Sequence, residues 1–179
     1  IEIFDRGTLS STIDKYLRGG GVPADFRNST PSELIDELSE EDGILQKWDR
    51  NGDKYLFLHR TFQEYLTASY LNRKIKENQN EGISAVKKLF WEYDSHETLI
   101  LLAGLMDKPV FLLQALTDEE DDIFKTLLLL AGRCLAECEQ YGNSKLDSTL
   151  TLVAKIIKRI YKLWRRYPNA SFIQSTVVA

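Results

Sequence analysis

Apolar side chains recur every three or four residues along most of the 179-residue chain, which is the spacing of one face of an α-helix. Leu9, Ile13 and Leu17 begin the pattern, and a run of glycines at 19–21 ends it. A second helix is expected next, because residues 30–33 read Thr-Pro-Ser-Glu, a capping box with proline in the first turn. The fold class is therefore predicted to be mainly α.

One stretch of the chain departs from helical spacing. Residues 44–49 and 54–59 form two short runs with aromatic and branched side chains, and Asn51-Gly52 lies between them. Asn and Gly tolerate the positive φ angles of a type I′ turn, so the sequence predicts a β-hairpin closed by these two residues. A second capping box at 61–64 then predicts a helix that runs to about Glu77. We predict no other β structure.

The second half of the chain is predicted to be an α-helical array. The polar stretch 78–82 precedes it and is the expected boundary between a module of residues 1–78 and a helical domain of residues 79–179. No repeat period of about 33 to 47 residues is visible, so the array is repeat-like only in its succession of helices. The predicted helices cover residues 84–93, 96–106, 110–116, 123–141 and 146–166.

The order helix, helix, hairpin and helix is typical of a winged-helix-like module with the hairpin as its wing. Winged helices often bind DNA through the second helix of the pair. Here that helix carries six carboxylates and no lysine or arginine over residues 32–42, and the chain has a net charge of −4. Repulsion by the phosphates would oppose binding, so no nucleic-acid partner is expected.

The sequence shows no clear arrangement of residues for catalysis or redox chemistry. The histidines are His59 and His96, and neither cysteine, Cys134 or Cys138, has a histidine one helical turn away. The spacing of the two cysteines on a predicted helix favours two buried thiols. We therefore expect no catalytic residues.

A calcium loop is suggested by Asp49, Asn51 and Asp53, which match its first three ligand positions. The position that requires glycine is Lys54, however, and the position that requires a bidentate glutamate is Arg60. We expect no metal ligands in this chain.

The hydrophobic pattern also indicates where in the cell the protein is located. No run of about 18 uncharged apolar residues occurs, and the first residues lack the basic and apolar regions of a signal peptide. These features predict a cytoplasmic protein with no membrane partner. Residues 155–166 nevertheless carry six cations and no acid. A membrane surface or an anionic partner is one interpretation of this stretch, and a solvated face of a packed helix is the interpretation that we favour.

Residues 55–71 read Tyr-Leu-Phe-Leu-His-Arg-Thr-Phe-Gln-Glu-Tyr-Leu-Thr-Ala-Ser-Tyr-Leu. This stretch resembles the end of the winged-helix domain in NACHT proteins, the NTPases of the STAND class that include the NOD-like receptors. The family pattern there is F-x-H-x-[ST]-F-Q-E-[FY], preceded by an aromatic strand. Residues 91–109 also look like the helical segment that follows this domain in bacterial NACHT proteins. The resemblance covers roughly residues 30 to 115.

The resemblance implies that the chain is a regulatory part of a nucleotide-driven switch, with an NTPase core upstream of Ile1. The chain itself contains no GxxxxGK[ST] motif, so we do not expect it to hydrolyse ATP, although the parent protein would be an ATPase switch. In the family, the histidine of the pattern contacts a phosphate of bound ADP and helps to hold the closed, inactive state. Here that histidine matches His59.

The physical setting of His59 is compatible with this role. A histidine just before a helix stands beside free backbone N–H groups and the positive end of the helix dipole, which favours an anionic partner. The competing interpretation is a histidine that is hydrogen-bonded to local backbone.

The resemblance further implies coupling of the ADP/ATP state to autoinhibition, oligomerisation and signalling, in antiphage defence or innate immunity. The parent protein would bind ADP or ATP with Mg²⁺. Its partners would be the upstream NACHT domain in cis, further copies of the parent, and a protein ligand. The alternative function is a helical protein–protein interaction scaffold with no nucleotide role.

Packing of the hairpin leads to one further expectation. Trp48, Phe62, Tyr65 and Leu66 should be buried where the hairpin meets the third helix, because they are the largest apolar side chains of the module. Truncation of Phe62 to alanine would then cost about 3 to 5 kcal/mol.

Overall fold

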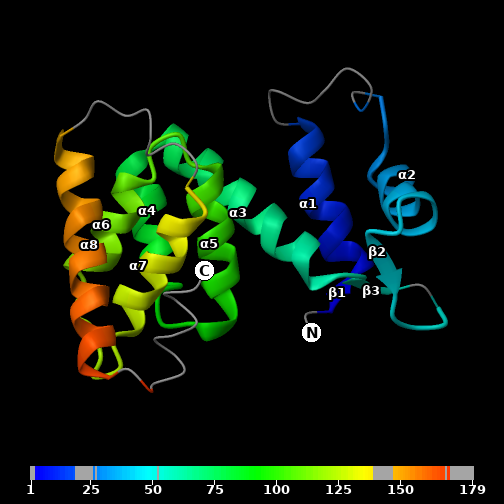
Figure 1. The fold of residues 1–179 in the computed structure, drawn as a ribbon. Helices are drawn as coiled ribbons and strands as arrows, with labels where there is room; N and C mark the ends of the chain where they lie inside the picture. The colour runs from blue at the N-terminus through cyan, green and yellow to red at the C-terminus, as the bar shows by residue number, and fades with distance from the viewer. Residues whose placement is uncertain are drawn as a thin grey trace. The chain divides into compact units, whose positions relative to one another are not determined.

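In a computed structural model the described residues are 3–18, 26, 28–51, 53–138, 147–167 and 169, and the chain forms two compact units (Figure 1). The first unit ends at Gln63 and the second begins at Glu64. The fold is mainly α with one small antiparallel sheet, so the predicted fold class is confirmed. The division lies inside a helix, and the stretch 78–82, where the sequence predicts a boundary, belongs to the second unit.

The first unit is built from two helices and three short strands. Its elements are β1 (Phe4–Asp5), α1 (Arg6–Arg18), α2 (Pro31–Asp36), a π-helical turn η2 (Glu37–Glu41), β2 (Leu45–Lys47) and β3 (Lys54–Phe57).

The start of α2 has the predicted capping box. The Thr30 side chain accepts a hydrogen bond from the Glu33 amide, and the Glu33 carboxylate accepts one from the Thr30 amide at 2.7 Å. These bonds from Thr30 hold the pKa of Glu33 below its ordinary value. Gly43 follows η2 with a φ of +62°, a conformation that glycine adopts without strain.

The sheet has the strand order β1-β3-β2, and both pairs are antiparallel. Strand β1 was not predicted, because two residues are too few to show an alternating pattern. The hairpin β2–β3 was predicted, but its register differs from that of a two-residue Asn51-Gly52 loop. Such a loop would place Lys47 opposite Leu56, whereas Lys47 lies opposite Tyr55.

A side chain explains the longer connection between β2 and β3. The Asp49 carboxylate accepts hydrogen bonds from the amides of Asp53 and Lys54, at 2.9 and 3.1 Å. An aspartate that bonds backbone groups a few residues later stabilises a turn of its own. The conformation of Gly52 lies outside the described residues.

The core of the first unit is small and centres on Tyr55. Its buried members are Ile35, Leu45 and Tyr55, and Leu9 and Phe57 are among the half-buried residues around them. A core of this size depends on how well its polar edge is satisfied, because a buried hydroxyl without a partner is costly.

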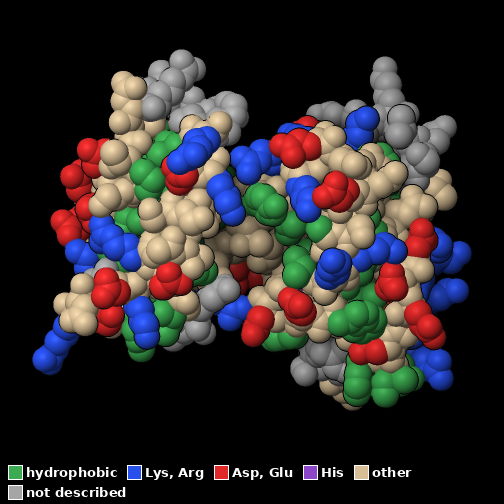
Figure 2. All heavy atoms as spheres, turned by 180° about the vertical axis from the view of Figure 1, so that it is seen from behind, with side chains coloured by type: hydrophobic (Ala, Val, Ile, Leu, Met, Phe, Trp, Pro, Cys, Tyr) green, Lys and Arg blue, Asp and Glu red, His purple; other side chains and the backbone are tan. Residues whose placement is uncertain are grey.

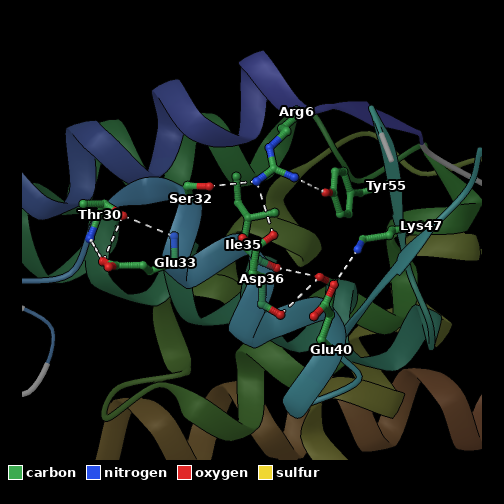
Figure 3. Close-up of polar contacts among 10 residues, drawn as sticks. Arg6, Thr30, Ser32, Glu33, Ile35, Asp36, Glu40, Lys47 and Tyr55 are labelled. Carbon is green, nitrogen blue, oxygen red and sulfur yellow. Dashed lines mark hydrogen bonds and ion pairs between the residues drawn. The ribbon is translucent and has the colours of Figure 1, made fainter. Parts of the chain in front are cut away.

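Arg6 supplies that partner. Its guanidinium donates to the Tyr55 hydroxyl at 2.7 Å, to the Ser32 hydroxyl at 2.8 Å and to the Asp36 carboxylate at 3.2 Å (Figure 3). Burial lowers the pKa of Arg6, but the interactions with Tyr55 and Asp36 outweigh it, and the pKa is raised overall. One side chain at the start of α1 thus joins α2 to β3.

Replacement of Tyr55 by phenylalanine should lower the free energy of unfolding of the first unit by about 1.5 kcal/mol, the lower end of the range for a hydrogen bond to a charged group, because the Arg6 guanidinium is partly exposed. The ring keeps its packing, so the change isolates the bond from Arg6. Urea unfolding of the chain with and without the substitution measures this difference. A double variant, Arg6→Met with Tyr55→Phe, should lose less than the sum of the two single changes, because the residues interact directly.

The second unit is an array of helices. It contains most of α3 (Arg60–Glu77), then α4 (Gln79–Lys87), a 3-10 turn η3 (Tyr93–Ser95), α5 (His96–Leu105), α6 (Val110–Asp118), α7 (Thr126–Ala136) and α8 (Asp147–Arg166). Helix α7 packs against α5, α6 and α8, and α4 packs against α6 (Figure 1). The continuous apolar core includes the fully buried Phe90, Leu102, Leu113 and Ile156.

The stretch 78–82 is the N-cap and first turn of α4, and only Asn78 separates this helix from α3. The Asn78 side chain accepts a hydrogen bond from the Glu81 amide and caps α4. Gly82 lies directly against the backbone of Ile75 in α3, so closely that a Cβ atom there would be 2.6 Å from the Ile75 Cα. A polar residue and a glycine are typical of a linker, but here they cap a helix and allow two helices to pack closely.

Helix α7 begins later than predicted. The Asp121 carboxylate accepts from the amides of Leu127 and Leu128, and the Asp122 carboxylate accepts from the Thr126 amide at 2.9 Å. The acidic run therefore caps the helix as expected, but across a loop whose last residue, Lys125, has a φ of 61°.

Candidate functional site

His59 occupies the junction between the sheet and α3. The preceding Leu58 amide donates to the Ile44 carbonyl at 2.9 Å, which holds the end of β3 in place. The His59 carbonyl accepts from the Phe62 amide at 3.1 Å, as the carbonyl of an N-cap residue does. Helix α3 begins at Arg60, so Thr61 lies in its first turn and not at the cap that the sequence predicts. His59 thus immediately precedes the first turn of an 18-residue helix.

The His59 side chain is exposed, and its imidazole makes no hydrogen bond to any residue that the structure describes. Its ring lies beside the Phe62 ring, with the centroids 6.0 Å apart. The alternative in which local backbone occupies the imidazole is therefore not what the structure shows. Within the described part of the chain, neither ring nitrogen has a hydrogen-bonding partner.

The predicted burial of the large apolar residues around this junction is wrong. Trp48 is 55% exposed and Phe62 41% exposed, and Tyr65 and Leu66 are exposed as well. Helix α3 buries a different face, through Ala68, Leu71 and Ile75. An amphipathic pattern identifies an apolar face but does not identify what covers it.

Phe62→Ala should therefore change the free energy of unfolding by about 1 kcal/mol or less, because a half-exposed side chain leaves no closed cavity. Ile35→Ala is the control in the same unit, since Ile35 is fully buried and its truncation should cost about 2 to 5 kcal/mol. Denaturant midpoints of the two variants test the contrast. A Phe62→Ala loss as large as that of Ile35→Ala would contradict the exposed placement.

Other candidate sites are limited in the described part of the chain. No group of three or more histidine, cysteine, aspartate or glutamate side chains there could hold a metal ion. Burial raises the pKa of the Cys134 thiol, which makes this cysteine a poor nucleophile. No helix among the described residues is long and apolar enough to cross a membrane.

Charges of both signs are mixed over the face shown in Figure 2, in keeping with the small net charge. Among the carboxylates of α2 and η2, Glu33, Asp36 and Glu40 are engaged with Thr30, Arg6 and Lys47 respectively. The acidic helix that argues against DNA binding is thus partly neutralised within its own unit, but it gains no basic face.

Two helices, a β-hairpin and the start of a third helix, with a small antiparallel sheet, define a winged-helix module. Residues 26–71 match the family described as the winged helix-turn-helix domain C-terminal to NACHT. The chain thus carries a winged-helix domain of the NACHT-associated kind, and the resemblance noted in the sequence is confirmed over this segment. No curated protein and no solved structure matches the chain.

The match includes His59 and ends at Leu71, so it covers α2, the hairpin and the first part of α3. It does not reach residues 72–115, where the resemblance to NACHT proteins stays a prediction. Arg6 precedes the matched segment and was missed in the sequence. Its partner Tyr55 lies 49 residues away, and no spacing rule links residues at that distance.

Proposed function

We propose that this chain is the regulatory winged-helix and helical part of a NACHT-type STAND NTPase, and that it couples the ADP or ATP state to autoinhibition, oligomerisation and signalling. The observation that carries the proposal is an exposed His59 imidazole, free of hydrogen bonds within the described structure, inside the segment that matches the NACHT-associated domain. An NTPase domain in cis, preceding this chain, would provide the nucleotide.

In this proposal His59 donates an imidazole N–H to a phosphate oxygen of ADP in the closed state. The two states of the switch differ in the bound nucleotide, ADP or ATP, and therefore in the phosphate charge near His59. The start of α3 favours that charge, because the helix dipole has its positive end there. A hydrogen bond between a ring at the end of β3 and a nucleotide on another domain would hold the two domains together.

The exposed apolar side chains near the junction support the same arrangement. Leu58 and Phe62 flank His59 in the chain and are both more than 40% exposed. Large apolar groups beside a polar contact are typical of the buried part of an interface between domains. Loss of the ADP contact would then free this surface, and the parent protein would open and self-associate.

The test is the nucleotide content of a purified protein that spans the NACHT domain and this chain. We expect about one ADP per chain to be retained through purification, as tight binding in a closed state requires. The 179-residue chain alone should show no measurable ADP or ATP binding by calorimetry, because one imidazole is not a phosphate cradle. A full-length protein without nucleotide, whose assembly ignores added ADP and ATP, would favour the helical scaffold instead.

A further inference from the structure

Helix α8 presents two different apolar faces. One face packs into the core of the second unit against α6 and α7, through the buried Ile156 and Ile160. The other consists of Leu150, Ile157, Tyr161 and Trp164, here called the outer stripe, whose members are 37–54% exposed. Successive members are seven, four and three residues apart, so they align along one side of the helix, next to the core face.

Two side chains of the outer stripe contact each other, and all four lie in line. The Tyr161 and Trp164 rings lie in contact, with their centroids 5.8 Å apart. The stripe runs parallel to the helix axis over four turns, or about 20 Å at 1.5 Å per residue. A flat surface could therefore meet all four side chains at once, while Ile156 and Ile160 stay in the core.

From Lys155 to the end of α8, every charged residue is a cation. Its six lysines and arginines are Lys155, Lys158, Arg159, Lys162, Arg165 and Arg166. Within the described structure, none of these six forms an ion pair with a carboxylate. Cations on the other helices of this unit do form them: Lys74 pairs with Glu81, Lys87 with Glu119, and Arg133 with Glu97.

The acidic segments of this same chain are poor complements for α8. Three of the five carboxylates of the run 118–122 already pair with Lys87 or cap α7, and three of the carboxylates of α2 and η2 are engaged within the first unit. Among the described residues, these two acidic segments of a second copy therefore offer no continuous, unengaged anionic surface along about 20 Å.

We propose that α8 binds the surface of a membrane that contains anionic phospholipids. The outer stripe would enter the boundary between headgroups and acyl chains, where tryptophan and tyrosine are favoured, and the cations beside it would contact lipid phosphates. A solvated face explains the cations but leaves the outer stripe unexplained. The inference is independent of the nucleotide switch.

Two other anionic partners fit less well. A nucleic acid offers phosphates but no continuous apolar layer for Ile157 and Trp164. An acidic protein would need carboxylates placed in register with cations spread around a third of the helix. A lipid surface requires no such register, because its headgroups are mobile and its charge is uniform.

The test is sedimentation of the 179-residue chain with vesicles of phosphatidylcholine containing about 30 mol% phosphatidylserine, at about 0.1 M salt. We expect binding at least about tenfold tighter than to phosphatidylcholine alone, and weaker binding at about 0.5 M salt. In a variant with Trp48 and Trp91 changed to phenylalanine, the fluorescence of Trp164 should shift to the blue on binding.

Two pairs of substitutions separate the contributions. Lys158→Gln with Lys162→Gln should weaken binding about tenfold or more, whereas Lys15→Gln with Lys88→Gln removes the same charge elsewhere and should have little effect. Ile157→Ser with Tyr161→Ser should abolish the vesicle binding and leave the melting curve nearly unchanged, because both residues are about half exposed.

Three results would overturn the proposal. These are no binding to the anionic vesicles, equal binding to both kinds of vesicle, and binding that the Ile157 and Tyr161 substitutions do not change. The first would leave an acidic protein as the occupant of α8. The third, together with equal affinity for heparin or DNA, would reduce the interaction to attraction between a polycation and any polyanion.

Discussion

Replacement of His59 by alanine, in a protein that spans the NACHT domain and this chain, is expected to accelerate ADP release at least about tenfold. A hydrogen bond to a charged group contributes roughly 1.5–3 kcal/mol, and about 1.4 kcal/mol corresponds to a factor of ten. The fold should survive, because the exposed ring makes no hydrogen bond within the described structure. Release of a fluorescent ADP analogue in stopped flow measures the rate.

The same variant should also assemble without its trigger, since a weaker closed state shifts the population towards the open one. Size-exclusion profiles at equal ADP concentration test this. His59→Gln retains an N–H donor and should lie between the wild type and His59→Ala. Gln46→Ala, an exposed change on β2, is the control and should behave as the wild type. A His59→Ala protein that melts earlier but releases ADP at the normal rate would defeat the assignment.

Features decided by a few neighbouring residues could be predicted from the sequence. The capping box of Thr30 and Glu33 and the end of the second helix at Gly43 depend on contacts within one helical turn, and both are present. The register of the hairpin could not be predicted in the same way. It depends on the Asp49 side chain, which competes with the Asn51-Gly52 turn for the same backbone.

Features decided between distant segments could not be read from the pattern. Ile156 and Ile157 are adjacent and chemically identical, yet one is buried and the other about half exposed, because only one side of α8 meets α6 and α7. The same holds for α3, where Phe62 was expected in the core and Ala68 is found there instead. Periodicity shows that a face is apolar, and only the tertiary structure shows which partner covers it.

The candidate site also has a part that the sequence could predict and a part that it could not. His59 was identified because it sits in a local motif, and the structure adds that its ring is exposed and without a hydrogen-bonding partner in the described part of the chain. The linkage of Arg6 to Tyr55 and Asp36 was not identified, since it joins residues 30 to 49 positions apart. This linkage is what fixes the hairpin, and with it the end of β3, against α1 and α2.

Gly82→Ala should lower the free energy of unfolding of the second unit by about 2 kcal/mol. A Cβ at this position would lie 2.6 Å from the Cα and 2.7 Å from the backbone N of Ile75, so α3 and α4 must separate to admit it. Overpacking of this kind costs typically 1–3 kcal/mol or more, which exceeds the gain of nearly 1 kcal/mol that alanine brings to a helix interior. Urea unfolding followed by circular dichroism measures the loss.

Gly104→Ala is the matched control, because it makes the same change within another helix of the same unit. Gly104 is exposed on α5, and a Cβ there would meet its nearest neighbour, the Glu137 carbonyl oxygen, at an ordinary 3.5 Å. The helix gains alanine at no steric cost, so this variant should be more stable by up to about 1 kcal/mol. Opposite signs for the two substitutions would establish that the start of α4 packs closely against the end of α3. Stabilisation by both would instead indicate that α3 and α4 are not in backbone contact and that the stretch 78–82 behaves as a linker.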